Sequence, residues 1–365
     1  MKKKVISIVL TMVMAASLAA CGSSATSTAT STAASSAASV TASATTSTAA
    51  STTTSTAAST GTAAASAATT SATASGKAVT DMKIAYVPTT MNNPFWTAMM
   101  GGVKEEMKAK NMDPDTQLVT VDAESDQAKM NNYVYDLINQ KVDAIILAPM
   151  DCTAVTEALQ ACADAKIPVI NVDTAVDRTD LVASVIASDN YKAGVDCAND
   201  MLSKLDKGSK IYVMDQPSGS ACVQREKGFL DTIGNSYTVI GTSDTSGDTA
   251  KSLPVAEDAI TADSELKAFF CINDMAALGC VQACAAANRK DILIYGVDGN
   301  PDFMGYVKDG SATGSAAQQP SVVGANAVDT ALDYLAGKTV EKNIVVPVEM
   351  ITADNISKFD ISAWQ

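Results

Sequence analysis

Polar side chains able to bind a small polyhydroxylated molecule follow several short apolar runs of this 365-residue chain. They are Asn93, Asp173, Asn273 and Asp298, and the aromatic residues Phe95 and Trp96 accompany the first of them. A carboxylate only accepts hydrogen bonds, whereas a carboxamide both donates and accepts, so such a set can satisfy the hydroxyls of one sugar. An aromatic ring suits the flat C–H face of the same ligand. The alternatives are helix capping for the polar residues and core packing for the two aromatics.

These residues need a scaffold in which short strands alternate with helices. Apolar, β-branched runs predict strands at 83–87, 117–121, 143–148, 167–171, 210–214, 237–241, 266–271, 292–297 and 344–348. Ala-rich segments predict helices at 94–110, 126–140, 153–165, 189–205, 221–233, 249–261, 275–287 and 322–335. Because the alternation restarts after residue 188, we expect two doubly wound α/β lobes, each with a parallel sheet. Ligands bind outside the carboxyl ends of such strands, where the polar residues fall.

Composition excludes several other kinds of site. The chain has no histidine, which excludes Ser-His-Asp and Cys-His catalysis and His-ligated zinc. Its formal net charge of -14 makes nucleic acid an unsuitable partner. Seven cysteines follow Cys21, and this odd number leaves at least one of them unpaired. Because the chain has no histidine and no C-x-x-C motif, a metal site is disfavoured, and we expect buried, reduced thiols that pack as small apolar residues. We expect no metal, no cofactor and no catalytic residue.

The N-terminus predicts export and anchoring. Three lysines precede the apolar segment Val5–Leu18, which is short for a membrane span. The following Leu18-Ala-Ala-Cys21 resembles the lipobox of bacterial lipoproteins, so residues 1–20 are expected to be a signal peptide and Cys21 the lipidation site; the alternative is an ordinary signal peptide. Residues 21–80 are mostly Ser, Thr and Ala and predict a disordered tether. The protein is therefore expected outside the cytoplasmic membrane, held by a lipid on Cys21.

Five motifs carry a resemblance to a known family. They are Asn92–Trp96, Ile186–Asn190, Arg225–Phe229, Asn273–Gly279 and Gly296–Asp302. With them, the region from Met82 to Val348 resembles the type I periplasmic sugar-binding proteins of the ribose/galactose-binding cluster. The resemblance implies a receptor that delivers a monosaccharide or related polyol to the permease subunits of an ABC transporter, without catalysis.

The resemblance also implies a lobe assignment and a set of ligand-binding residues. The N-terminal lobe would comprise 81–188 and 318–349, and the C-terminal lobe 189–317 and 350–365, joined by a three-segment hinge near Ser188, Gln318 and Glu349. The ligand-binding residues carried over are Asn93, Phe95, Trp96, Asp173, Arg225, Asn273, Asp298 and Gln318.

Three positions depart from the ribose-binding pattern. Thr174 stands where an arginine is usual, Gly247 where the second lobe usually has an aromatic, and Trp96 where a phenylalanine is usual. The sugar's identity is thus open, and a larger or differently shaped sugar or polyol could fill the space near Gly247. Two other functions are weighed: a sensor that signals to a membrane kinase, and an exported carbohydrate-active enzyme. The enzyme is disfavoured because the chain lacks histidine and the G-x-S-x-G and G-x-G-x-x-G motifs.

Overall fold

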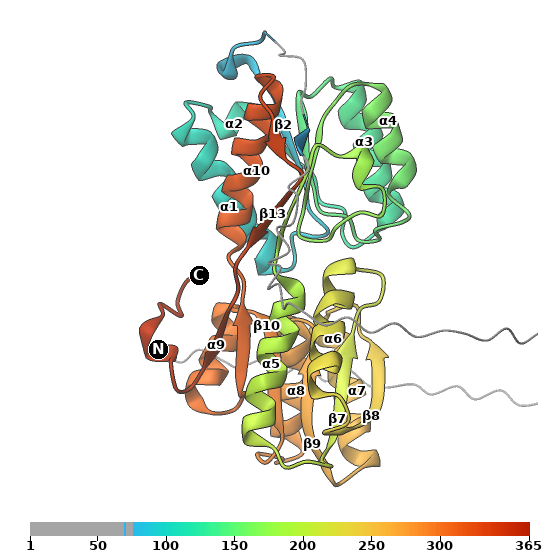
Figure 1. Cartoon of the computed structure of the whole chain (residues 1–365), viewed down its shortest axis with the longest axis vertical. Coiled ribbons are helices and arrows are strands. Elements are labelled where there is room, and N and C mark those ends of the chain that lie inside the picture. The colour runs from blue at the N-terminus through green and yellow to red at the C-terminus, as the bar shows by residue number, and fades with distance from the viewer. Residues whose placement is uncertain (1–68, 71–75) are drawn as a thin grey trace, which may run out of the picture. The chain divides into compact units, whose positions relative to one another are not determined.

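The computed structural model describes residues 69–70 and 76–365 (Figure 1). The predicted signal peptide, the predicted lipidation site Cys21 and most of the predicted tether lie outside the described residues. Near the end of that segment, Thr69–Thr70 (β1) pair antiparallel with Val340–Glu341 (β12), and Val79–Asp81 form a 3-10 turn (η1). Over the part of the chain that the structure describes, none of the helices has the length and apolarity to span a membrane.

The first lobe is built on a six-stranded, wholly parallel sheet in the order β13-β6-β5-β4-β2-β3. Its strands are β2 (Ile84–Val87), β3 (Leu118–Thr120), β4 (Ala144–Leu147), β5 (Val169–Val172), β6 (Ser184–Ser188) and β13 (Asn343–Val346). Its helices are α1 (Pro94–Ala109), α2 (Pro114–Gln117), α3 (Gln127–Asn139), α4 (Thr156–Asp164) and α10 (Pro320–Leu335), with the 3-10 turn η2 (Thr179–Leu181). Successive strand residues point to opposite faces: Ile146 packs with α1 and α10, whereas Ile145 packs with α3 and α4. Figure 1 shows these two helix layers on either side of the sheet.

The second lobe is built on a six-stranded sheet in the order β14-β11-β10-β9-β7-β8, in which only β14 runs antiparallel to its neighbour. Its strands are β7 (Lys210–Asp215), β8 (Thr238–Asp244), β9 (Leu266–Cys271), β10 (Leu293–Asp298), β11 (Gly314–Ala317) and β14 (Glu349–Thr352). Its helices are α5 (Asn190–Lys204), α6 (Ser220–Ile233), α7 (Thr249–Ala262), α8 (Asp274–Ala286) and α9 (Pro301–Asp309), with the 3-10 turn η3 (Ile356–Lys358). Phe270 packs with α5 and α6, and stacks on Phe229 at 4.0 Å, whereas Phe269 packs with α7, α8 and α9.

The chain passes between the two sheets three times. It leaves β6 at Ser188 to begin α5, leaves β11 at Ala317 to begin α10, and leaves β13 at Val346 to begin β14. Each connection is short, and each lies where the resemblance placed a crossover. The expected architecture of two doubly wound lobes joined by three segments is confirmed.

Several elements were not predicted. The strands β6, β11 and β14 and the helix α9 are absent from the pattern of apolar runs. The residues of β11 are Gly-Ser-Ala-Ala, which have low β propensity, and this strand forms because it is buried and paired on both sides by β10 and β14. Helix α4 begins at Thr156 rather than at residue 153, because the carboxylate of Asp151 holds Thr153 and Ala154 in a turn.

Candidate ligand-binding site

A cavity of about 320 Å³ lies at the carboxyl ends of strands from both sheets. Its volume falls in the range of about 300–1,000 Å³ that is usual for small-molecule sites. All eight ligand-binding residues carried over by resemblance line it: Asn93, Phe95, Trp96, Asp173, Arg225, Asn273, Asp298 and Gln318. The structure therefore brings together residues that are up to 225 positions apart in the sequence (318 − 93 = 225).

The first lobe contributes its aromatic residues through the start of α1. The Asn93 side chain caps this helix by accepting a hydrogen bond from the backbone N–H of Phe95 at 3.0 Å, and Pro94 occupies the first helical position. Phe95 and Trp96 lie edge to face, with ring centroids 5.0 Å apart. Both are buried in the first-lobe core and both line the cavity, so the packing role and the ligand role apply to the same side chains.

Asp173 is presented by a loop that follows β5. The buried Asn171 side chain fixes this loop: its amide donates to the carbonyls of Leu147 and Thr174, and its oxygen accepts from the N–H of Val176. Asp173 itself has a positive φ of 62°. The hydroxyl of Thr174, the position at which the resemblance implied an arginine, donates its hydrogen bond to Asp173 Oδ2 at 3.0 Å.

Arg225 is held by a close crossing of α5 and α6. A Cβ on Gly194 would lie 1.9 Å from the carbonyl oxygen of Arg225, so only glycine lets the two backbones meet there. Asn190, at the start of α5, then accepts a hydrogen bond from Arg225 Nε at 2.7 Å, while Nη1 donates to the carbonyl of Ile272 at 2.9 Å. Asn190 in turn donates to the carbonyl of Ser188, at the first crossover. Asn190 is thus a positioning residue that sequence reasoning noted only as part of a motif.

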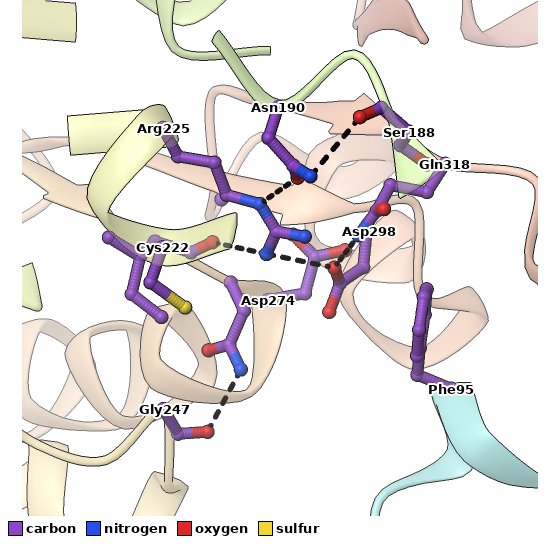
Figure 2. Close-up of polar contacts among 12 residues, drawn as sticks. Phe95, Ser188, Asn190, Cys222, Arg225, Gly247, Asp274, Asp298 and Gln318 are labelled. Atoms are coloured by element: carbon purple, nitrogen blue, oxygen red, sulfur yellow. Dashed lines mark hydrogen bonds and ion pairs between the residues drawn. The ribbon is translucent and has the colours of Figure 1, made fainter. Parts of the chain in front are cut away.

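Carboxylates from both lobes flank the buried guanidinium. Arg225 Nη2 lies 3.8 Å from Asp173 Oδ1, and Nη1 lies 3.6 Å from Asp298 Oδ1. Gln318 Nε2 donates to the same oxygen of Asp298 at 2.6 Å, as Figure 2 shows. Gln318 is 1% exposed, and its Oε1 has no hydrogen-bond partner among the residues that the structure describes. An unpartnered buried acceptor in a cavity wall calls for a hydrogen-bond donor on a ligand.

A second buried carboxylate, that of Asp274, holds the loop that follows Asp298. Asp274 accepts hydrogen bonds from the N–H of Asn300 at 2.7 Å and from the hydroxyl of Ser315 at 2.8 Å. Burial raises the pKa of Asp298 to about 7, although Arg225 and the Gln318 amide favour its ionised form. Burial and the neighbouring Asp298 raise the pKa of Asp274 well above its ordinary value. The backbone φ of Asp298 is 138°, which lies in a region that residues other than glycine rarely adopt.

Asn273 joins two loops of the second lobe. Its Oδ1 caps α8 by accepting from the N–H of Ala276 at 2.8 Å, and its Nδ2 donates to the carbonyl of Gly247 at 3.0 Å. A Cβ on Gly247 would lie 2.6 Å from Asn273 Nδ2 and 3.1 Å from Gln216 Oε1. The two carboxamides therefore occupy the space beside Gly247, which sequence reasoning had offered to a larger ligand.

Thr174 and Gly247, which the sequence analysis named as departures from the ribose-binding pattern, also line the cavity. The remaining lining residues were not selected from the sequence; they are Thr89, Thr90, Asn92, Ser125, Pro149, Met150, Gln216, Cys222, Ser246, Asp248, Lys251 and Met275. Thr89, Pro149 and Gln216 follow β2, β4 and β7, so the rule that selected Asp173 and Asp298 could have selected them. Six of the seven cysteines beyond Cys21 are buried, as expected, whereas Cys152 is only half-buried.

Comparison with known proteins agrees with the fold. Residues 84–339 match the family model of the periplasmic binding protein domain. The ribose import binding protein of Bacillus subtilis is 34% identical over 265 residues, which cover 72% of this chain and 85% of that protein. A solved ABC transporter solute-binding protein from Agrobacterium vitis with bound D-fucose is 30% identical, with a TM-score of 0.71 and coverage of 76% of this chain and 97% of that one.

A second solved structure is similar to the same extent. The binding-protein component of the arabinose ABC transporter from Shewanella sp. ANA-3, bound to L-arabinofuranose, is 28% identical, with a TM-score of 0.71 and coverage of 76% of this chain and 94% of that one. The match to the family model, and the sequence identity and coverage of the ribose import binding protein, together show that this chain belongs to the periplasmic binding protein family.

Proposed function

We propose that this chain is an extracytoplasmic solute-binding lipoprotein that captures a neutral monosaccharide or related polyol between its two lobes. The observation that carries the proposal is the polar set around the cavity. Arg225 retains N–H groups beyond those bonded to Asn190 and Ile272, and Asp173 and Gln318 present acceptor oxygens. Hydroxyl groups both donate and accept, so one polyhydroxylated molecule can satisfy all three residues.

The charge around Arg225 favours a neutral ligand over an anionic one. Arg225, the one buried cation among the described residues of the cavity wall, already faces two carboxylates, Asp173 and Asp298. The other cation in the described lining, Lys251, is exposed and donates to Ser246, so an anionic group near Arg225 would add a negative charge beside two buried carboxylates, which is costly. Phe95 and Trp96 supply the apolar surface for the C–H face of a sugar ring.

The functions of the similar proteins support the proposal that this chain delivers its ligand to a transporter. The names of the similar proteins describe ribose import and arabinose transport, which are binding functions rather than catalytic ones. We propose that the permease subunits of an ABC transporter are the protein partner and that the chain has no enzyme activity. The lobes would close on the sugar, because residues of both lobes line the cavity. A sugar that contacts both lobes has a higher affinity for the closed state, and this difference in affinity shifts the equilibrium between open and closed states.

The lobe boundaries are part of this proposal. The assignment of 81–188 and 318–349 to one lobe and of 189–317 and 350–365 to the other is supported by the sheets, since β13 joins the first sheet and β11 and β14 join the second. The tether before residue 81 and the lipid on Cys21 would hold both lobes outside the membrane.

The test is a binding screen on the full-length mature protein. Thermal unfolding is measured with D-ribose, D-allose, D-fucose, L-arabinose and myo-inositol, and with the anionic sugar D-glucuronate as a charge control. At a hundredfold excess over Kd, a ligand stabilises the folded protein by about 2.7 kcal/mol. We expect at least one neutral compound to raise the Tm and glucuronate to leave it unchanged. Stabilisation by glucuronate alone, or by none of the compounds, would refute the proposal.

A further inference from the structure

The last seven residues of the chain, 359–365, contact both lobes. Phe359 and Ile361 pack against the second-lobe core cluster that includes α7, α8 and α9. Trp364, three residues after Ile361, packs instead against the first-lobe core cluster that includes α1 and α10. Sequence reasoning had placed residues 350–365 with the second lobe alone. We call residues 359–365 the C-terminal turn.

Hydrogen bonds within the C-terminal turn give it a defined shape. The carboxylate of Asp360 accepts from both the N–H and the hydroxyl of Ser362, at 3.0 and 2.6 Å. The Asp360 carbonyl accepts from the N–H of Ala363, and the Gln365 side chain donates to the same carbonyl at 3.2 Å. The Ser362 bonds lower the pKa of Asp360, so this carboxylate stays ionised as an acceptor at neutral pH. Trp364 is therefore carried on a closed turn rather than on a free end.

The indole of Trp364 lies against a ring that lines the cavity. The centroids of Trp364 and Phe95 are 5.7 Å apart, with an edge-to-face angle of 74°. Phe95 makes a second edge-to-face contact with Trp96 at 5.0 Å. The whole chain has only two tryptophans, and both contact this one phenylalanine. Trp364 is not among the residues that line the cavity, whereas Phe95, which it contacts, is among them.

We propose that Trp364 is a positioning residue for the sugar site, holding the Phe95 ring from a turn that is anchored in the second lobe. This proposal deepens the proposed function and, for its effect on affinity, rests on it. The stacking surface of the first lobe is then tied to the second lobe by a side-chain contact, in addition to the three backbone crossovers. A change in the relative position of the two lobes would then also change the orientation of the Phe95 ring.

The first arm of the test needs no ligand. Urea unfolding is measured for the full-length mature protein, for Trp364→Ala, for Phe95→Leu and for the double variant. If the rings contact each other, the unfolding equilibrium constant of the double variant departs from the product of the single effects by roughly two- to tenfold, as for other aromatic pairs. Additive effects would overturn the proposal, whichever sugar the protein binds.

The second arm measures affinity by calorimetric titration with D-ribose, D-allose, D-fucose and L-arabinose. We expect Trp364→Ala to raise the Kd of each bound sugar by roughly three- to tenfold. Trp364→Phe, which keeps an aromatic edge, should restore affinity to within about twofold of wild type, and Trp364→Ala should add no further loss in a Phe95→Leu background. The matched control is Tyr135→Ala, which removes a partly exposed first-lobe aromatic outside the cavity lining and should leave Kd unchanged.

The two arms separate the two proposals. If wild-type protein binds none of the four sugars, the proposed function fails on this panel, while the unfolding cycle still decides whether Trp364 holds Phe95. If a sugar binds wild type and Trp364→Ala with the same Kd, the positioning role is overturned and the proposed function stands. A loss in Trp364→Ala that Trp364→Phe does not restore would also overturn it, because ring contact would not be the cause.

Discussion

Arg225→Lys is the substitution that most directly tests how the cavity recognises a ligand. It keeps the positive charge between Asp173 and Asp298 but replaces a planar fork of five N–H groups with a single ammonium. Arg225 makes hydrogen bonds at 2.7 Å to Asn190 and at 2.9 Å to the carbonyl of Ile272. A lysine ammonium cannot reach both partners and also lie near both carboxylates, so the cation will lose its fixed position.

The magnitude follows from those bonds. Hydrogen bonds to a charged group contribute about 1.5–3 kcal/mol each. Losing one bond of this kind to the ligand raises the Kd by roughly 10- to 100-fold. The assay is calorimetric titration of the sugar selected in the thermal screen, with thermal unfolding of the ligand-free variant to confirm that it is folded. Arg225→Ala is the more severe variant, and breaking a buried ion pair in this way costs about 3–5 kcal/mol of stability.

The chain offers a matched control for this experiment. Arg289, also in the second lobe, makes a two-point interaction with Asp291 and donates to the carbonyl of Leu266, but it lies outside the cavity lining. Arg289→Lys should leave the Kd unchanged. A folded Arg225→Lys protein that binds the same sugar with a Kd within about twofold of wild type would refute the view that a fixed guanidinium recognises the ligand.

Three further predictions concern pH, backbone and anchoring. Burial raises the Asp298 pKa to about 7 from its ordinary 3.8, so between these values the folded protein binds more protons than the unfolded chain. Asp298 alone should therefore lower the free energy of unfolding by about 2 kcal/mol from pH 5.5 to 7.5, and Asp298→Asn should reduce the total fall by about that amount, leaving the part due to Asp274, whose pKa is also raised; an equal fall in that variant would contradict the assignment. Gly247→Ala should weaken sugar binding at least about tenfold, because its Cβ meets Asn273, whereas Gly208→Ala, with a similar positive φ but nothing within 4 Å, should change only stability. Cys21→Ala should abolish labelling by a radioactive fatty acid, and undiminished labelling would place the anchor elsewhere.

The alternation of apolar runs with Ala-rich segments predicted most helices and strands to within a few residues, because buried parallel strands have a simple pattern. It missed β11, whose small residues become a strand only through pairing with β10 and β14. It also missed α9, although Asn300 and Pro301 form a recognisable helix start. Local pattern therefore identifies strands rich in β-branched residues, and it fails for β11, where pairing with distant strands decides.

The same distinction holds in the cavity. Asn93, Asp173, Asn273 and Asp298 were predictable because a parallel sheet places the ends of its strands at one edge. The arrangement of their partners was not predictable, since it depends on contacts such as the backbone approach of Gly194 to Arg225 that brings Asn190 to the guanidinium. The Trp364–Phe95 contact was also beyond reach, because nothing in residues 359–365 indicates which lobe they meet.

The two carboxylates beside Arg225 show that this site is kept at the expense of local backbone stability. Asp173 and Asp298 both have positive φ values, 62° and 138°, and both are buried. Such conformations cost about 1–3 kcal/mol each, and glycine would relieve most of that strain. Glycine would also remove the carboxylate that faces Arg225, so strain relief and ligand recognition cannot be satisfied by the same residue. The surrounding network, with Asn171 fixing one loop and Asp274 fixing the other, holds each aspartate in the conformation that directs it at the cavity.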